Sequence, residues 1–177
     1  EDVINWSKTQ KWYQEPFILV GHSLGGICVA LYAEKFSERV KALAPISTVV
    51  SGKISGEAHG KEMLTKWEKT GWIEEESAGR PGLIKRLKWS HYLDRLKYDL
   101  LPEVDKLTMP VLMVVGEKDD KTPLEHQKIL FDKLLGKKEL HIIKNAPHSF
   151  REKEHLEELK TIFIKWLKSL DYKTILL

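Results

Sequence analysis

The sequence predicts an α/β fold, a parallel sheet with flanking helices, and three observations indicate it. Short apolar runs alternate along the chain with longer segments of helical periodicity. The runs are continuously apolar, as in parallel strands that are buried on both faces. The chain of 177 residues is long enough for one core of ordinary size. We expect residues 1–50 and 106–177 to form this core, with residues 51–105 inserted between them.

The expected elements follow one another as strand and helix along the core. The strands are predicted at 17–20, 40–47, 111–115 and 140–143, and the helices at 24–36, 124–135 and 156–167. Pro16 and Pro110 precede two of the strands, where a proline disfavours continued helix, and Gly136 stops the second helix. Right-handed crossovers are expected to join these strands into one sheet.

Residues 51–105 interrupt this alternation. The segment begins rich in glycine and serine and then carries many large apolar residues without a convincing strand, so we expect a mostly helical insertion. Trp67, Trp72 and Trp89 have two interpretations. They line a pocket, or they form the small core of the insertion itself, which is the more common position of large aromatics.

Composition excludes several classes of function. The net charge of +3 comes from interspersed Lys and Glu, which gives no support for nucleic-acid binding. No apolar run approaches the roughly 18 residues of a membrane-spanning helix. The single cysteine, Cys28, rules out an intrachain disulfide and is expected as a small apolar residue in the buried stripe of the first long helix. We expect no metal, no cofactor, and a cytoplasmic location compatible with reduced thiols.

The strongest motif is Gly-His-Ser-Leu-Gly at residues 21–25, at the junction of the first strand and the helix that follows. A sharp turn there would present the Ser23 hydroxyl above the sheet edge, and it needs small residues two positions before and after the serine. The helix N-terminus directs its amides at the same point, so Leu24 N–H is the expected donor to an oxyanion. The alternative is that Ser23 merely caps the helix.

Two later loops supply candidate partners for this serine. Asp119 and Asp120 follow the third strand, at the sheet edge where open α/β folds carry their functional groups, and His148 follows the fourth. A neutral imidazole is suited to taking a serine proton near pH 7, and an ionised Asp would orient it. Otherwise the Asp residues are solvated turn residues and the His is polar surface. His22 should point away from Ser23, because neighbours on a strand face opposite sides.

This combination resembles the α/β-hydrolase superfamily, in particular its serine hydrolases of the esterase and lipase type, over nearly all the chain outside the insertion. The family spacing of Gly116, the acid and Pro123 selects Asp119, with Asp120 one residue out of step. The resemblance implies a catalytic triad of Ser23, Asp119 and His148, and a helical cap at residues 51–105. It implies hydrolysis of carboxylic esters with small to medium acyl groups, through an acyl-enzyme.

Several alternatives stay open at this point. Peptidases, thioesterases and acyltransferases share the same triad, and a non-catalytic binding module can retain the fold. The family usually has four further strands before residue 17 and a loop that supplies a second oxyanion donor, so we expect this chain to be the C-terminal part of a longer protein. The strand at 17–22 would then have an unpaired edge, prone to self-association, and the isolated segment would be nearly inactive.

Overall fold

The computed structural model describes residues 1–77, 80 and 82–170. It separates into two compact units, Glu1–Val49 with Leu100–Leu177, and Val50–Asp99. The last seven residues of the predicted core range 106–177 lie outside the described part.

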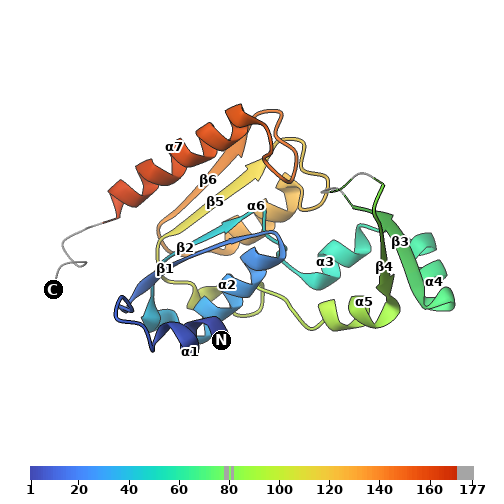
Figure 1. Cartoon of the computed structure of the whole chain (residues 1–177), viewed down its shortest axis with the longest axis horizontal. Coiled ribbons are helices and arrows are strands. Elements are labelled where there is room, and N and C mark those ends of the chain that lie inside the picture. The colour runs from blue at the N-terminus through green and yellow to red at the C-terminus, as the bar shows by residue number, and fades with distance from the viewer. Residues whose placement is uncertain (78–79, 81, 171–177) are drawn as a thin grey trace. The chain divides into compact units, whose positions relative to one another are not determined.

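The first unit is built on a four-stranded parallel sheet (Figure 1). Its strands are β1 (Phe17–His22), β2 (Val40–Ile46), β5 (Val111–Gly116) and β6 (Lys138–Ile143), in that spatial order. The helices are α1 (Asp2–Ser7), α2 (Leu24–Lys35), α6 (Leu124–Lys133) and α7 (Lys153–Ser169), with 3-10 turns at Ser37–Arg39 and Val104–Lys106. The predicted α/β class and parallel sheet are confirmed.

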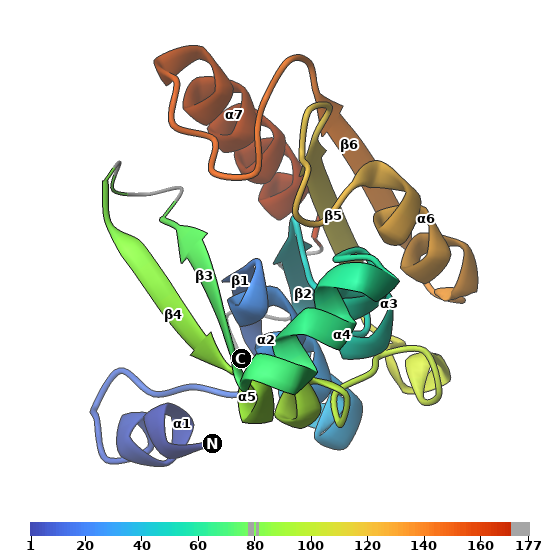
Figure 2. The ribbon, with the colours of Figure 1, turned by 90° about the vertical axis from the view of Figure 1, so that its right-hand side faces the viewer.

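Both faces of the sheet are covered, which explains why β5 is apolar throughout and β2 is apolar from Ala42 to Ile46. In Figure 2, α7 lies on one side of the strands and α6 on the other. Ala42 and Ala44 of β2 pack in one buried cluster with Trp166 of α7. Their neighbours in β2 point to the opposite face by strand alternation, and Leu43 there is fully buried. Continuous burial of this kind requires the unbroken apolar runs seen in the sequence.

Strand β1 lies at the edge of the sheet. It pairs with β2 from Phe17 to His22, and within the described residues no strand pairs with its other edge. Val20 in the middle of β1 is 50% exposed, in contrast to the fully buried positions of β5. The expected edge position of residues 17–22 is confirmed; self-association through that edge stays a prediction.

The second unit contains α3 (Gly52–Glu57), α4 (Lys61–Thr70) and α5 (Trp89–Arg95) together with a hairpin of β3 (Trp72–Glu76) and β4 (Ile84–Lys88). The expectation of a mostly helical segment without a strand is therefore wrong for 72–76 and 84–88, and residues 78, 79 and 81 of that segment lie outside the described part.

The hairpin escaped prediction because its strands are short and rich in charge. In β3 the buried apolar side chain is Ile73, and three consecutive glutamates follow it, so the strand has no apolar alternation. Across the hairpin, Glu74 faces Arg86 and Glu75 faces Lys85. Opposite charges at directly paired positions stabilise an antiparallel ladder, an effect that appears only once the register is known.

A small aromatic core holds the second unit together. Trp67 is 1% exposed and clusters with Ile73 and Tyr92, while Trp89 packs against them. The Trp67 indole donates to the Leu87 carbonyl at 3.1 Å, which satisfies its only polar group. Of the two interpretations of the tryptophans, the internal core therefore describes Trp67 and Trp89.

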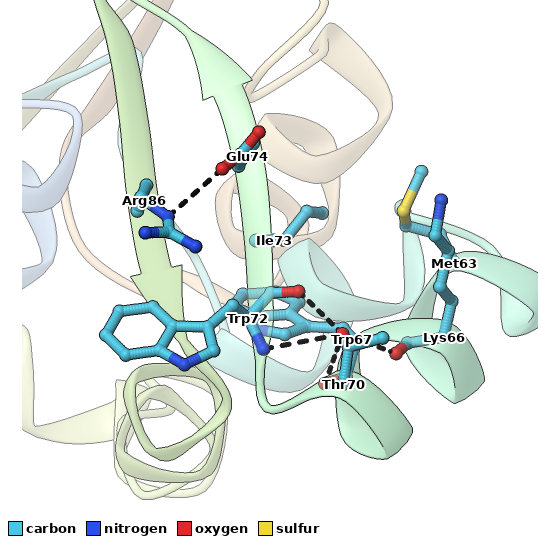
Figure 3. A pocket seen from close by; sticks show the side chains of 8 residues that line it. All are labelled: Met63, Lys66, Trp67, Thr70, Trp72, Ile73, Glu74 and Arg86. Atoms are coloured by element: carbon cyan, nitrogen blue, oxygen red, sulfur yellow. Dashed lines mark hydrogen bonds and ion pairs between the residues drawn. The ribbon is translucent and has the colours of Figure 1, made fainter.

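Trp72 is 42% exposed and lies instead at a hollow of about 380 Å³ on the surface of this unit (Figure 3). Apolar and charged side chains of α4, β3 and β4 line the hollow together. Arg86 forms an ion pair with Glu74 at 3.0 Å, and its guanidinium lies 5.3 Å from the centre of the Trp72 ring.

The two ends of the second unit are tied to each other. Ser51 and Asp99 form an isolated antiparallel bridge, reinforced by a hydrogen bond from the Ser51 hydroxyl to the Asp99 carboxylate at 3.0 Å. The next residue, Gly52, donates its N–H to the Tyr98 carbonyl at 2.8 Å. The chain thus leaves β2 and returns toward β5 through neighbouring points.

Candidate active site

Ser23 occupies a strained turn between β1 and α2. Its φ of 57° and ψ of −120° place a non-glycine residue in a sparsely populated region, which costs on the order of 1–3 kcal/mol. Surrounding backbone bonds hold it there: Ser23 N–H donates to the Ile46 carbonyl at 3.0 Å, and Ser23 C=O accepts from Gly26 N–H at 3.0 Å. Strain of this kind at a strand–helix junction exposes a side chain above the sheet.

Gly21 and Gly26, rather than Gly25, are the small residues that this turn requires. A Cβ at Gly21 would lie 2.8 Å from Gly26 N and closer still to the Gly25 carbonyl, whereas Cβ contacts below 3.0 Å essentially never occur. A Cβ at Gly26 would lie 2.7 Å from Thr48 Cβ. A Cβ at Gly25 would meet nothing within 4 Å, so the expectation of a required small residue there is wrong.

The three predicted residues lie in one hydrogen-bonded row, although they come from loops more than 25 residues apart in sequence. His148 Nε2 lies 2.9 Å from Ser23 Oγ, and His148 Nδ1 lies 2.9 Å from Asp119 Oδ2. Because a carboxylate can only accept, Nδ1 carries the hydrogen, which leaves Nε2 free to accept the serine proton. This is the arrangement of nucleophile, base and orienting acid.

Of the two candidate acids, Asp119 and Asp120, Asp119 is the buried one. Its side chain is fully buried and accepts from the backbone N–H groups of Lys121 and Thr122 at 3.0 and 2.8 Å. Burial alone would raise the pKa of Asp119, but hydrogen bonds from His148 and Thr122 outweigh it and hold the pKa at about 2. Asp120 lies outside the row, 71% exposed and paired with Lys121.

His148 is fixed from behind by His22. His22 Nε2 lies 2.8 Å from the His148 carbonyl, to which it donates, and the two rings are 4.8 Å apart. His22 therefore supports the loop of His148 through a hydrogen bond, and its ring nitrogen is bonded to that carbonyl and not to Ser23.

The oxyanion donor proposed from sequence lies at the start of a helix. Helix α2 begins at Leu24, so Leu24 N–H is one of the first four amides, which have no acceptor within the helix. The positive end of the helix dipole also favours negative charge at this point. Its use as a donor stays a prediction, as does a second donor from outside this chain.

Cys28 is exposed, which contradicts its predicted place in the buried stripe of α2. The residues of α2 that are buried include Ile27, Ala30 and Ala33. The sequence analysis placed the buried face of α2 on the side of the larger side chains, but Leu24 at the start of that face is 50% exposed. Small residues face the sheet because they let the helix approach the strands closely.

Within the described part of the chain, no group of three or more His, Cys, Asp or Glu side chains is placed to hold a metal ion. The same residues include no helix long and apolar enough to cross a membrane. The hydrogen bonds described at Ser23, Asp119 and His148 all join protein atoms to one another.

Comparison with known proteins gives the family. The sequence profile of the prolyl oligopeptidase family matches residues 2–171. The chain belongs to this family. No curated protein sequence matches this member of the prolyl oligopeptidase family.

Solved structures share its α/β-hydrolase fold. Alpha/beta hydrolase domain-containing protein 10 from mouse is 24% identical with a TM-score of 0.76, over 96% of this chain and 68% of that one. Est1E from Butyrivibrio proteoclasticus, solved with ferulic acid, is 22% identical with a TM-score of 0.68, over 95% of this chain and 64% of that one. The monoacylglycerol lipase of Paleococcus ferrophilus is 23% identical with a TM-score of 0.70, over 96% and 72%.

Sequence reasoning missed the buried residues around the row. Ser47, Thr122 and Gln127 are 0–2% exposed and lie beside or behind Asp119. Each is a polar residue of a common type in a loop or an early helical turn, so the sequence carried no signal for its burial. The proximity of Thr122 to Asp119 in sequence was the one available hint.

Proposed function

We propose that the complete protein is a serine hydrolase that cleaves carboxylic esters of small to medium acyl groups, with Ser23, His148 and Asp119 as its triad. One observation carries this proposal: the two ring nitrogens of His148 lie 2.9 Å from Ser23 Oγ and 2.9 Å from Asp119 Oδ2. The prolyl oligopeptidase family match and the names of the similar esterases and lipases support hydrolysis as the reaction class.

In the first half of the reaction, Ser23 Oγ attacks the carbonyl carbon of the ester while its proton passes to His148 Nε2. The ionised Asp119 stabilises the resulting imidazolium, and Leu24 N–H donates to the oxyanion of the tetrahedral intermediate. When the intermediate collapses, the bond to the alcohol oxygen breaks and His148 returns the proton to that oxygen. The alcohol leaves, and the acyl group remains as an ester on Ser23.

In the second half, water replaces the alcohol. His148 takes a proton from the water as its oxygen attacks the acyl-enzyme, and the second tetrahedral intermediate releases the carboxylic acid while Ser23 regains its proton from His148. We expect the second oxyanion donor to come from outside these 177 residues. Loss of one such donor lowers the rate about 10²- to 10³-fold, so this chain alone should turn over slowly.

Peptide hydrolysis is the second candidate, because the matching family is named for its oligopeptidases. The triad chemistry is the same, but the leaving group is an amine that must be protonated as the bond breaks. Thioesterase and acyltransferase activity differ from ester hydrolysis only in the leaving group or the acceptor.

The test uses this chain and a version extended upstream, each with a Ser23→Ala control. Both are treated with a fluorophosphonate probe, then assayed with p-nitrophenyl acetate and butyrate and with the matching p-nitroanilides. We expect labelling that is lost in Ser23→Ala, and turnover of the esters above the anilides in the extended protein. Faster anilide hydrolysis would favour the peptidase. A folded extended protein that neither labels nor turns over would overturn the proposal and favour a binding module.

A further inference from the structure

Two fully buried polar side chains, Thr122 and Gln127, lie behind Asp119. Thr122 is 2% exposed and Gln127 is 0% exposed. Burial of a hydroxyl or an amide is unfavourable unless its hydrogen-bonding groups find partners. The hydrogen-bond partners of Thr122 and Gln127 therefore indicate the role of each side chain.

The Thr122 hydroxyl lies among three polar atoms. Its Oγ1 is 3.0 Å from Asp119 Oδ2, 2.9 Å from the Ser47 carbonyl and 3.3 Å from His148 Nδ1. A hydroxyl has a single hydrogen to donate. If that hydrogen pointed to Ser47, a lone pair of Oγ1 would face the carboxylate. Donation to the carboxylate leaves a lone pair facing the neutral Ser47 carbonyl instead, which is the weaker repulsion, and it gives the stronger, charge-assisted bond.

The two oxygens of Asp119 are supported unequally. Both backbone donors, Lys121 N–H and Thr122 N–H, reach Oδ1. His148 Nδ1 lies 2.9 Å from Oδ2 and 3.0 Å from Oδ1, and the Thr122 hydroxyl lies 3.0 Å from Oδ2. A hydrogen bond from the buried Ser47 side chain also lowers the pKa of Asp119. The Thr122 hydroxyl therefore supports the oxygen that the two backbone donors do not reach.

Gln127 in turn fixes the segment that carries Thr122. Its Nε2 donates to the Thr122 carbonyl at 3.1 Å and to the Thr48 carbonyl at 2.8 Å, while its Oε1 accepts from Thr48 N–H at 3.3 Å. Thr48 is also the residue whose side chain packs over Gly26, beside the turn of Ser23. One buried amide therefore connects the loop of the acid with the surroundings of the nucleophile.

We propose that Thr122 is a positioning residue that holds Asp119 Oδ2 in line with His148 through its hydroxyl. The inference rests on the proposed function, since it assigns Thr122 a role in the same hydrolytic site. It goes further in treating the acid as a pair of residues, a carboxylate and the hydroxyl that orients it.

The first measurement is the NMR resonance of the His148 Nδ1 proton in this chain, which reports the bond to Asp119 without any turnover. The charged or titratable groups near this bond are His22, His126 and the exposed Asp120–Lys121 pair, and none of them changes in the variants. Thr122→Val removes the hydroxyl at nearly constant volume, and Thr122→Ser keeps it. Thr70→Val is the control for loss of a threonine hydroxyl, because that hydroxyl donates to the Lys66 carbonyl in the second unit and not to Asp119.

In Thr122→Val we expect the proton resonance to move downfield, because an Oδ2 that has lost a donor accepts more strongly from His148, or to be lost through faster exchange with water. Thr122→Ser and Thr70→Val should resemble the wild type. A resonance in Thr122→Val that is unchanged in position and exchange rate would overturn the inference.

The second measurement is the rate of fluorophosphonate labelling of Ser23 in the extended protein. It should fall about tenfold in Thr122→Val, the effect of one charge-assisted hydrogen bond, and recover in Thr122→Ser. Equal rates in all variants would contradict the positioning role while leaving the proposed function intact. Absence of labelling in the wild type would contradict the proposed function, and the proton resonance would still report on Thr122.

Discussion

Alanine substitutions at the two glycines of the Gly-His-Ser-Leu-Gly motif should have opposite effects on stability. Gly21→Ala should destabilise the fold, and Gly25→Ala should stabilise it. A Cβ at Gly21 would press on backbone atoms, 2.8 Å from Gly26 N and closer to the Gly25 carbonyl, and backbone cannot move aside as a flexible side chain can. Overpacking of this kind costs about 1–3 kcal/mol, and contact with backbone points to the upper half of that range.

Gly25 provides the matched control two residues beyond the serine. It lies in the first turn of α2 with nothing within 4 Å of an added Cβ. Alanine loses less conformational entropy than glycine on folding into a helix, so Gly25→Ala should stabilise by roughly 0.5 kcal/mol. The two variants should therefore differ by about 3 kcal/mol in free energy of unfolding, or on the order of 10 °C in Tm.

The assay is urea unfolding followed by circular dichroism, with equal slopes required so that midpoints report stability. Fluorophosphonate labelling of Ser23 in the extended protein provides a second comparison, which should slow in Gly21→Ala and persist in Gly25→Ala. Equal midpoints for the two variants, or a Gly25→Ala protein less stable than Gly21→Ala, would refute the geometry of this turn.

Further predictions concern the acid, the insertion and the cysteine. Asp119→Asn should lower the Ser23 labelling rate about 10³- to 10⁴-fold, because the amide no longer fixes the correct imidazole tautomer, while the exposed Asp120→Asn should leave it unchanged. The folded-state pKa of about 2 for Asp119 lies below the ordinary value of 3.8 for an aspartate, so its contribution of about 2 kcal/mol is present above pH 4 and is lost as the pH falls through 2. Unfolding titrations of wild type and Asp119→Asn should converge over that window, and parallel curves would contradict the shift. Trp67→Leu should destabilise by about 3 kcal/mol, and Trp72→Leu by much less, in the same urea assay. The Cys28 thiol should react with a maleimide in the native state, and slow reaction limited by unfolding would show that it is buried.

The sequence predicted the strands of the sheet and the loops that follow them. The continuous apolar runs marked the buried strands, and parallel strands deliver their carboxyl ends to one edge. Ser23 and His148 could therefore be placed together from the residues that follow two strands. The choice of Asp119 over Asp120 came from family spacing, and the structure shows its physical counterpart, a buried carboxylate beside an exposed one.

The parts that were missed depend on contacts between distant segments. The burial of Gln127 follows from the path of Thr48, 79 residues away, to which it donates. The hairpin at 72–88 depends on pairing of Glu74 with Arg86, which a single strand does not reveal. The rotation of α2 about its axis, which exposes Cys28, is decided by how closely the helix can approach the strands. Local periodicity predicted helix α2 but not its rotation, and it predicted neither the strands of the hairpin nor the contacts of Gln127.

The bridge between Ser51 and Asp99 bears on how this protein can change over evolution. Because the two ends of the second unit are paired with each other, the entropy cost of closing this loop is set mainly by its length, and that cost grows only slowly, by about 0.6 kcal/mol for each doubling. Segments of other lengths and folds can therefore be exchanged at this junction while the hydrolase core keeps its stability. Diversification of the region between these strands is then open to recombination of whole modules as well as to point mutation.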